Sequence, residues 1–385
     1  MLVHSSWIIV YNRLARWFKS VPALLLIVLF AFTASAQSEF KGLEHLFTPP
    51  ENYVVYHTDH PPVIDGNINE LVWQQVAWTN EFQDIEGAAK PHPTYPTKVK
   101  MLWDDSSLYI AAQITEPQVW STLKHHDDII FHDNDFEVFI DPNNAAQTYF
   151  EVEANALNTI FDLLLNKPYR DGGNAIINWD LKALRSAVKV QGTLNNASDQ
   201  DQGWTIEMAI PFKSVSIGNR TRVPQEGTLW RINFSRVEWD TKVVNGNYVK
   251  LTDSAGRVLP EHNWVWSPQG VVNMHYPERW GYLQFSRQSS GSVKFNLPYA
   301  EQQKQYLWLI YYRQKQWLSG HHSYALSLHD LGIDETVSIN KNKNTLKLEG
   351  TQHQFMASIS DSESKVMWAI DQSGLIQQLI ISPHE

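Results

Sequence analysis

The residues best suited to chemistry lie in two short runs of the sequence, 134–142 and 149–157. In each run, apolar residues alternate with acidic or amide residues, and this period of two is typical of a half-buried strand. If the two runs pair as a hairpin, one sheet face presents a dense polar set, namely Glu137, Glu151, Glu153 and Asn155. We expect the function to lie on this face, and the alternative is an ordinary solvated outer face.

A loop of unusual composition follows the second run. Residues 158–173 are richer in Arg, Lys, Asp and Tyr than a simple connection requires. Arg170 can donate two parallel hydrogen bonds to a carboxylate, such as that of an acidic sugar. The alternative is a surface pair of Arg170 and Asp171 that closes the loop.

Short alternating runs separated by turn residues must position these side chains. Runs 98–103 and 108–115 flank Asp104-Asp105-Ser106-Ser107, which indicates a hairpin, and Asn69 can cap a brief helix that reaches Trp78. Further strand candidates are 187–194, 205–211, 229–239, 264–266 and 281–286. Because no long amphipathic helix interrupts them, the sequence predicts a mainly β fold, an antiparallel β-sandwich.

The pattern changes near the C-terminus. Residues 288–298 have the composition of a linker at their start, and apolar residues at helical spacing follow from Tyr299 to Leu318. Short strand-like runs then occur at 345–348, 355–359, 366–370 and 376–381. The sequence therefore predicts a sandwich over residues 45–287 and a small α+β module of unknown role over residues 299–385.

The first 36 residues are typical of a secretory signal. Three basic residues precede an apolar run from Val21 to Phe32, and Ala34-Ser35-Ala36 supplies the small residues of a cleavage site before Gln37. A retained anchor is the weaker interpretation, because the run is shorter than the ~20 residues of a membrane span. We expect a secreted or periplasmic protein with no stable membrane insertion after cleavage.

Composition excludes several kinds of site and partner. The chain has no cysteine, so disulfides, thiolate metal sites and covalent haem are excluded. With 41 acidic against 31 basic residues and no basic tract, no nucleic-acid partner is expected. The 16 Trp and 15 Tyr residues are either buried or available to stack on the faces of sugar rings.

Several stretches together resemble carbohydrate-binding module family 9, a group of DOMON-like β-sandwiches. Pro62-Val63-Ile64-Asp65-Gly66 is similar to the opening of the family, and the runs 99–105 and 136–141 are similar to its central strands. Trp266-Ser267-Pro268 and Trp280-Gly281-Tyr282-Leu283 are similar to its close. The similarity spans roughly residues 50 to 286, with the motifs in the order of the family.

The resemblance implies a β-sandwich that binds sugars, often beside enzymes that degrade xylan or cellulose. The family holds a terminal sugar between two aromatic rings, with acidic and amide side chains on its hydroxyls. Glu137 matches the acidic ligand, and Glu153 or Asn155 falls near the amide ligand. One ring position falls at Phe131 and the other near Met274-His275, so that Trp120 or Trp264 is a candidate replacement.

The resemblance also implies structural calcium. Acidic residues crowd the central strand and its ends, and calcium takes six to eight oxygen ligands. The candidate ligands are Asp133, Asp135 and Asp141. The spacing does not match an EF-hand loop, and a bare acidic loop is what the sequence alone supports.

Two other classes of function compete with a carbohydrate-binding protein that acts in carbohydrate catabolism. A glycoside hydrolase needs two carboxyl groups roughly 5–10 Å apart, which Glu137, Glu151, Glu153 or Asp162 could provide. A b-type haem domain for electron transfer needs axial ligands, for which the candidates are Met101, Met208, Met274, His132 and His275. Most buried Met residues fill cores, so no haem is expected.

Overall fold

The structure is a computed structural model that describes residues 39–218, 220–362 and 366–380. The predicted signal peptide, residues 1–36, lies outside the described residues. Among the helices that are described, none is both long enough and apolar enough to cross a membrane.

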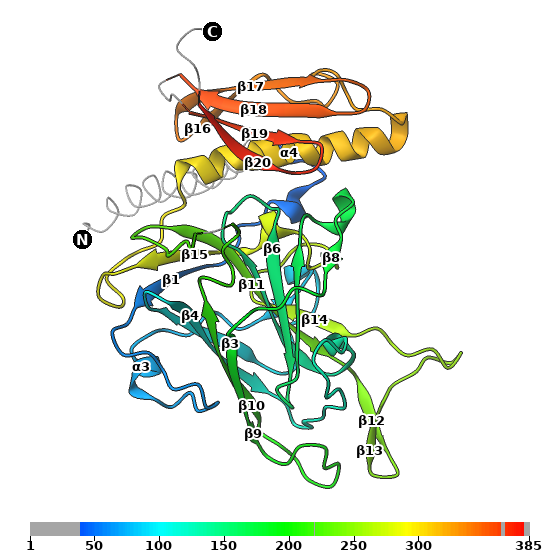
Figure 1. Ribbon diagram of the computed structural model, residues 1–385. Coiled ribbons are helices and arrows are strands. Elements are labelled where there is room, and N and C mark those ends of the chain that lie inside the picture. Colours follow the sequence, from blue (N-terminus) through cyan, green and yellow to red (C-terminus); the bar gives the residue numbers. More distant parts are fainter. Residues whose placement is uncertain (1–38, 219, 363–365, 381–385) are drawn as a thin grey trace, which may run out of the picture. The chain divides into compact units, whose positions relative to one another are not determined.

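The chain divides into two compact units, residues 1–47 and 48–385. The described part of the first unit contains the 3-10 helix η1, Glu44–Leu46. The second unit contains a large β-sheet, the helix α4 (Tyr299–His321) and a small β-sheet (Figure 1). This mainly β architecture with a C-terminal helix and sheet confirms the fold class that the short alternating runs predict.

Thirteen strands form the large sheet, which curls around one hydrophobic core. Its order is β8-β7-β6-β5-β11-β15-β1-β3-β4-β10-β9, and β14 pairs with both β11 and β2. The bounds are β1 Asn52–His57, β2 Gln83–Asp84, β3 Thr97–Trp103, β4 Ser107–Thr115, β5 Asp135–Asp141, β6 Tyr149–Asn155, β7 Ile160–Leu165, β8 Ala175–Ile176, β9 Arg185–Gln191, β10 Gly203–Pro211, β11 Leu229–Glu238, β14 His262–Val265 and β15 Gly281–Ser286.

Shorter elements connect these strands. β12 (Thr241–Val244) and β13 (Asn247–Lys250) form a separate two-stranded hairpin. The 3-10 helices are η2 Gly87–Ala89, η3 Ile130–His132, η4 Tyr169–Asp171 and η5 Pro277–Arg279. The helix predicted from Asn69 to Trp78 is shorter, because α3 covers only Leu71–Gln74 and its N-cap is Glu70.

β1 departs from the predicted antiparallel pattern. It runs parallel to both of its neighbours, β15 and β3, while the other pairs of this sheet are antiparallel. The sheet is therefore mixed. Alternation along one strand sets which face each side chain takes, but it does not set the direction of a neighbour that is distant in sequence.

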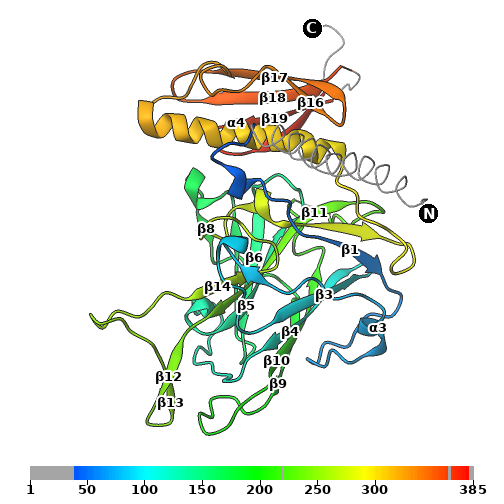
Figure 2. The ribbon, with the colours of Figure 1, turned by 180° about the vertical axis from the view of Figure 1, so that it is seen from behind.

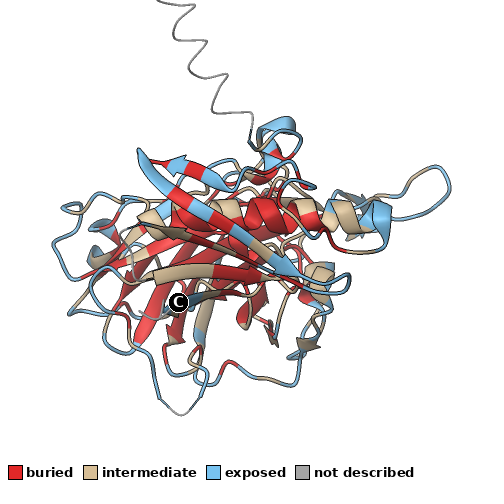
Figure 3. Cartoon of the chain, turned by 90° about the horizontal axis from the view of Figure 1, so that it is seen from above, coloured by how far each residue is buried: buried red, intermediate tan, exposed pale blue. Residues whose placement is uncertain are grey.

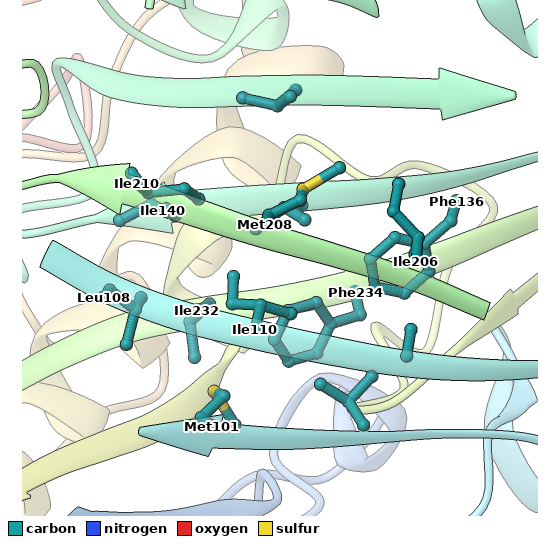
Figure 4. Close-up of a cluster of buried hydrophobic side chains, with 14 of the residues drawn as sticks. Met101, Leu108, Ile110, Phe136, Ile140, Ile206, Met208, Ile210, Ile232 and Phe234 are labelled. Atoms are coloured by element: carbon teal, nitrogen blue, oxygen red, sulfur yellow. The ribbon is translucent and has the colours of Figure 1, made fainter. Parts of the chain in front are cut away.

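Alternation within the strands builds the core. β5 directs Phe136, Val138 and Ile140 inward, where they are buried with residues of the opposite part of the sheet. Figure 4 shows this cluster, in which Met101 and Met208 lie among the aliphatic and aromatic side chains. These two methionines therefore act as core residues.

The C-terminal part confirms the predicted switch from strand to helix periodicity. α4 is followed by an antiparallel sheet in the order β16-β17-β18-β19-β20, and α4 lies along this sheet in both views (Figures 1 and 2). The bounds are β16 Thr336–Ile339, β17 Asn342–Gly350, β18 Phe355–Asp361, β19 Val366–Asp371 and β20 Ile376–Ile380. The sequence runs predict the last four of these strands but not β16.

Much of α4 is buried, although polar residues are frequent in it (Figure 3). Leu307, Ile310 and Tyr311 are fully buried, and so are the charged residues Glu301 and Lys304. Glu301 forms an ion pair of 3.2 Å with Arg231 of β11. The helix therefore has buried polar contacts with the large sheet as well as with the small one.

Candidate functional site

Two neighbouring strands place the predicted polar residues on one sheet face. β5 and β6 pair antiparallel, with Glu137 directly opposite Glu153 and Phe139 directly opposite Glu151. Residues that are directly opposite have Cβ atoms about 4.5–5.5 Å apart. Because the inward phase of each strand is apolar, all three carboxyl groups point to the other face.

These three carboxyl groups line a cleft of about 470 Å³. Its walls come from segments that are far apart in the sequence, including η3, η4 and the connection between β14 and β15. The aromatic rings that line the cleft are Phe131, Phe139, Phe161, Tyr169 and His275. Further polar groups in the lining are Glu261, Asn263 and Asn273. The cleft thus combines ring faces with hydrogen-bonding groups.

The carboxyl groups of the cleft have no basic partner. Burial raises the pKa of Glu137 to about 7. Burial, and next the charge of Glu137, raises the pKa of Glu151 to about 8 and that of Glu153 well above its ordinary value. In the described ranges, none of the three forms an ion pair. At neutral pH the cluster therefore retains protons.

His275 contributes a neutral ring to the cleft wall. Its Nδ1 lies 3.1 Å from the hydroxyl of Tyr149, and its ring meets that of Tyr169 edge-on at 4.6 Å between centroids. Burial, and next the charge of Arg170, lowers the pKa of His275 to about 4. His275 is therefore uncharged at neutral pH and adds no positive charge beside the carboxyl groups.

Arg170 uses its guanidinium within the fold. Its guanidinium donates two hydrogen bonds of 2.9 Å to Glu278, one of 3.0 Å to the carbonyl of His275 and one of 3.2 Å to Tyr311. The preceding residue, Tyr169, lines the cleft instead. The loop therefore contributes Tyr169 to the cleft, while the charge of Arg170 is used inside the fold.

Asn155 is also a structural residue. Its amide nitrogen donates to the carbonyl of Leu123 and to Asp133, at 2.9 and 3.0 Å. Its amide oxygen accepts from the backbone of Leu157 and Thr159, both at 3.0 Å. All the hydrogen-bonding positions of this amide are used, so it has none left for a sugar hydroxyl.

The three predicted calcium ligands do not form one site. Asp135 and Asp141 are at opposite ends of β5, about 20 Å apart at the rise of a strand. Asp133 accepts from Thr122 and Leu123, and Asp141 accepts from three backbone N–H groups. The closer acidic set is Asp135, Glu137 and Glu153, whose oxygens lie within 4.8 Å of one another.

The two tryptophans proposed as clamp rings lie elsewhere. Trp120 is buried in a cluster with Val237 and Trp239 and borders a different cavity. Trp264 is in the main core, with its ring edge-on to Tyr95 at 6.2 Å. Phe131, the other proposed ring, does line the cleft.

The remaining residues of the lining were missed or only approached by sequence reasoning. Met274 and His275, near which the second ring position falls, both line the cleft. Glu261, Asn263 and Asn273 lie in or near the irregular connection that contains these two residues. No alternation marks that connection, and its motif Trp266-Ser267-Pro268 lies outside the lining, so only the folded chain brings it opposite β5 and β6.

The sequence matches one described family. The family "Carbohydrate family 9 binding domain-like" matches residues 64–274, which is more than half of the chain. Among curated proteins, an endo-1,4-beta-xylanase A of Thermoanaerobacterium saccharolyticum and the exoglucanase XynX of Acetivibrio thermocellus are each 27% identical over 161 residues. The aligned region is 42% of this chain but only 12% of each of those proteins.

Solved structures show lower sequence identity. One is a carbohydrate binding module family 9 from Caldicellulosiruptor kristjanssonii in complex with glucose, 17% identical, with a TM-score of 0.41 over 64% of this chain and 100% of that chain. Another is a putative carbohydrate-binding protein from Bacteroides uniformis, 14% identical, with a TM-score of 0.45 over 62% of this chain and 100% of that chain.

Proposed function

Because this chain belongs to the carbohydrate family 9 binding domain-like family, we propose that it binds carbohydrate in the cleft over β5 and β6. The observation that supports this most is the placement of three carboxyl groups beside the rings of Phe131 and Tyr169 in one cleft. A sugar presents apolar C–H faces, which pack on rings, and hydroxyl edges, which hydrogen-bond carboxyl groups.

We also propose the wider role that the relatives suggest. Enzymes named as a xylanase and an exoglucanase contain a region similar to this chain. A plant or microbial oligosaccharide or polysaccharide is therefore the proposed ligand, and an accessory role beside glycoside hydrolases is the proposed setting. The predicted secretory signal agrees with such a role, since these polymers lie outside the cell.

Calorimetry with glucose-, xylose- and glucosamine-based oligosaccharides tests the binding proposal. Glu137→Gln should weaken binding by about 1.5–3 kcal/mol, roughly ten- to hundredfold, because a charged hydrogen bond is lost. Glu349→Gln is the matched control, since Glu349 is exposed on β17 and loses the same charge. If wild type binds none of these sugars, the proposal is wrong.

A glycoside hydrolase is the second candidate, favoured by the raised pKa values of Glu137 and Glu151. A general acid needs such a value. However, the two carboxyl groups of a glycosidase flank the cleaved bond, and Glu137, Glu151 and Glu153 all come from two adjacent strands of one face. Incubation with oligosaccharides and analysis of the products decides this point, and release of shorter sugars that Glu137→Gln abolishes would favour the enzyme.

A further inference from the structure

The cleft is unusual in the sign of its charge. Four glutamates line it, namely Glu137, Glu151, Glu153 and Glu261, whereas no Lys or Arg is among the described residues of its lining. A neutral sugar would cover these groups and withdraw them further from water. Burying a charge without a partner costs free energy, and the described residues of the lining supply no positive counterpart.

One carboxyl oxygen in particular lacks a partner. Glu151 is only 5% exposed, lines the cleft, and its Oε2 has no hydrogen-bond partner. Asp135, next to this set on β5, likewise has a buried Oδ2 with no partner. Glu153, by contrast, accepts a hydrogen bond of 3.0 Å from the backbone N–H of Phe131. Buried polar atoms are nearly always satisfied in folded proteins, so these free oxygens indicate a missing donor.

Other buried carboxylates of the same chain do have cations. Asp171 lies 2.8 Å from Lys315, and Glu278 lies 2.9 Å from Arg170. The fold can therefore supply a basic partner where a carboxylate serves structure. Among the described residues, no such basic side chain lies beside Glu151, so a donor for this carboxyl group would have to come from a ligand.

We propose that the cleft selects a sugar with a positively charged amino group, such as a β-1,4-linked glucosamine oligosaccharide. This inference rests on the proposed carbohydrate binding and specifies its ligand. An ammonium group has three N–H donors and no acceptor, which complements a set of carboxylate oxygens. Charge-assisted hydrogen bonds of this kind are about twice as strong as neutral ones.

The aromatic rings of the cleft indicate that the ligand also has an apolar surface. A bare cation would use the carboxylates and leave Phe131 and Tyr169 without a partner on the cleft side. A pyranose ring that bears an ammonium group uses both kinds of surface, because its apolar face can pack on the rings while its charge meets the carboxylates. An N-acetylated sugar has the same ring but no charge, so it provides the sharpest comparison.

Three trisaccharides with the same linkage test the proposal by calorimetry, namely the glucosamine trimer, the N-acetylglucosamine trimer and cellotriose. EDTA in every buffer removes divalent cations that could occupy the carboxylates. A pH of about 6.5 keeps an amine with a pKa near 8 charged. We expect the glucosamine trimer to bind at least tenfold more tightly than either neutral trimer, and this preference should shrink as salt screens the charges.

Glu151→Gln keeps the shape of the side chain and removes the carboxylate, whose charged form a bound ammonium group would stabilise although the pKa of Glu151 is about 8 without a ligand. It should reduce the affinity for the glucosamine trimer roughly tenfold while changing the affinity for cellotriose about twofold or less. Glu349→Gln should change neither affinity. An unaltered melting temperature of Glu151→Gln separates a loss of recognition from a loss of folding.

The outcomes separate the two proposals. Equal affinity for all three trimers, or an equal loss for charged and neutral sugars in Glu151→Gln, would overturn the preference for a cation and leave carbohydrate binding intact. If none of the three trimers binds, the preference for a cation is wrong, and the xylose-based oligosaccharides then decide whether the protein binds carbohydrate at all.

Discussion

Two sets of buried acidic residues in this molecule differ in one respect, the presence of basic partners. The cleft acids, Glu137, Glu151 and Glu153, have none. The helix-facing acids, which we define as Asp171, Glu278 and Glu301, are all paired with basic side chains. Both sets are buried, so burial alone does not distinguish a carboxylate that is paired within the fold from one that is available to a ligand.

The pKa directions follow this difference. Burial alone would raise the pKa of Glu301, but the charges of Lys304 and Arg231 outweigh it and hold that pKa below its ordinary value. In the cleft no such charge opposes burial, and the pKa of Glu151 is about 8. Glu301 thus stabilises the contact between α4 and the large sheet in its charged form, whereas the charged forms of the cleft acids are held at a cost in stability.

Removal of α4 and the small sheet should have the largest effect on stability. A chain that ends at Arg287 leaves Arg231 without Glu301 and Arg170 without Tyr311. Removing one partner of a buried pair costs about 3–5 kcal/mol, so the loss should exceed about 5 kcal/mol, or the shortened chain should aggregate. Solubility and chemical denaturation measure this, and a stable, soluble product would show instead that residues 299–385 are the independent module that the sequence predicts.

Breaking a single pair should have the next largest effect. Arg170→Met leaves the buried Glu278 without its bidentate partner and should lower the free energy of unfolding by about 3–5 kcal/mol. Urea denaturation checks this value. Surface ion pairs contribute about 1 kcal/mol or less. A loss of unfolding free energy below that value would show that the ion pair of Arg170 is solvated.

The pH dependence of stability should reveal the cleft acids. The pKa values of Glu137 and Glu151 are raised in the folded protein, to about 7 and about 8. Their stabilising protonation is therefore complete below the unfolded pKa near 4.3 and is lost as the pH rises through the folded values. We expect the melting temperature to fall between about pH 5 and pH 9, and to fall less in Glu151→Gln.

Glu301, one of the helix-facing acids, gives the opposite sign. The pKa of Glu301 is lowered in the folded protein, so its contribution is present above the unfolded pKa and is lost as the pH falls through the folded value. Between pH 5 and pH 9 it should change little. A melting temperature that is constant over this range would show that the charges of the cleft acids are already compensated, by hydrating water or by a bound ion.

The sequence predicts features that depend on residues close together in the chain better than features that depend on contacts between distant segments. Alternation and turn residues, as in the hairpin of β3 and β4 around Asp104, predict strands and the shared face of Glu137 and Glu153. The parallel course of β1 and the approach of Tyr169 and His275 to the cleft depend on contacts between distant segments. No local pattern encodes those contacts.

Three of the predicted site residues have one feature in common. The side chains of Arg170, Asn155 and Asp133 can bind a ligand, and each of them forms hydrogen bonds within the fold. The residue type determines which groups a side chain can hydrogen-bond, but it does not determine which of those groups lies beside it in the folded protein. The cleft acids differ because the fold provides no basic side chain in the lining that surrounds them.

The smallest effect should come from a ring of the cleft. Phe131→Ala removes one face against which a sugar can pack, which should weaken sugar binding by about 0.5–1.5 kcal/mol, the size of a ring contact beyond its buried area. The backbone N–H of residue 131 still donates to Glu153 in this variant, so the carboxylates keep their arrangement. Trp120→Phe is the control, because Trp120 borders another cavity and the smaller ring keeps an apolar contact for Phe131, which packs against the cluster of Trp120, so the affinity should stay unchanged. Calorimetry on both variants with the tightest trimer measures the two effects. Loss of affinity in Trp120→Phe but not in Phe131→Ala would move the sugar to the cavity beside Trp120 and would remove the link between the unpaired acids and the ligand.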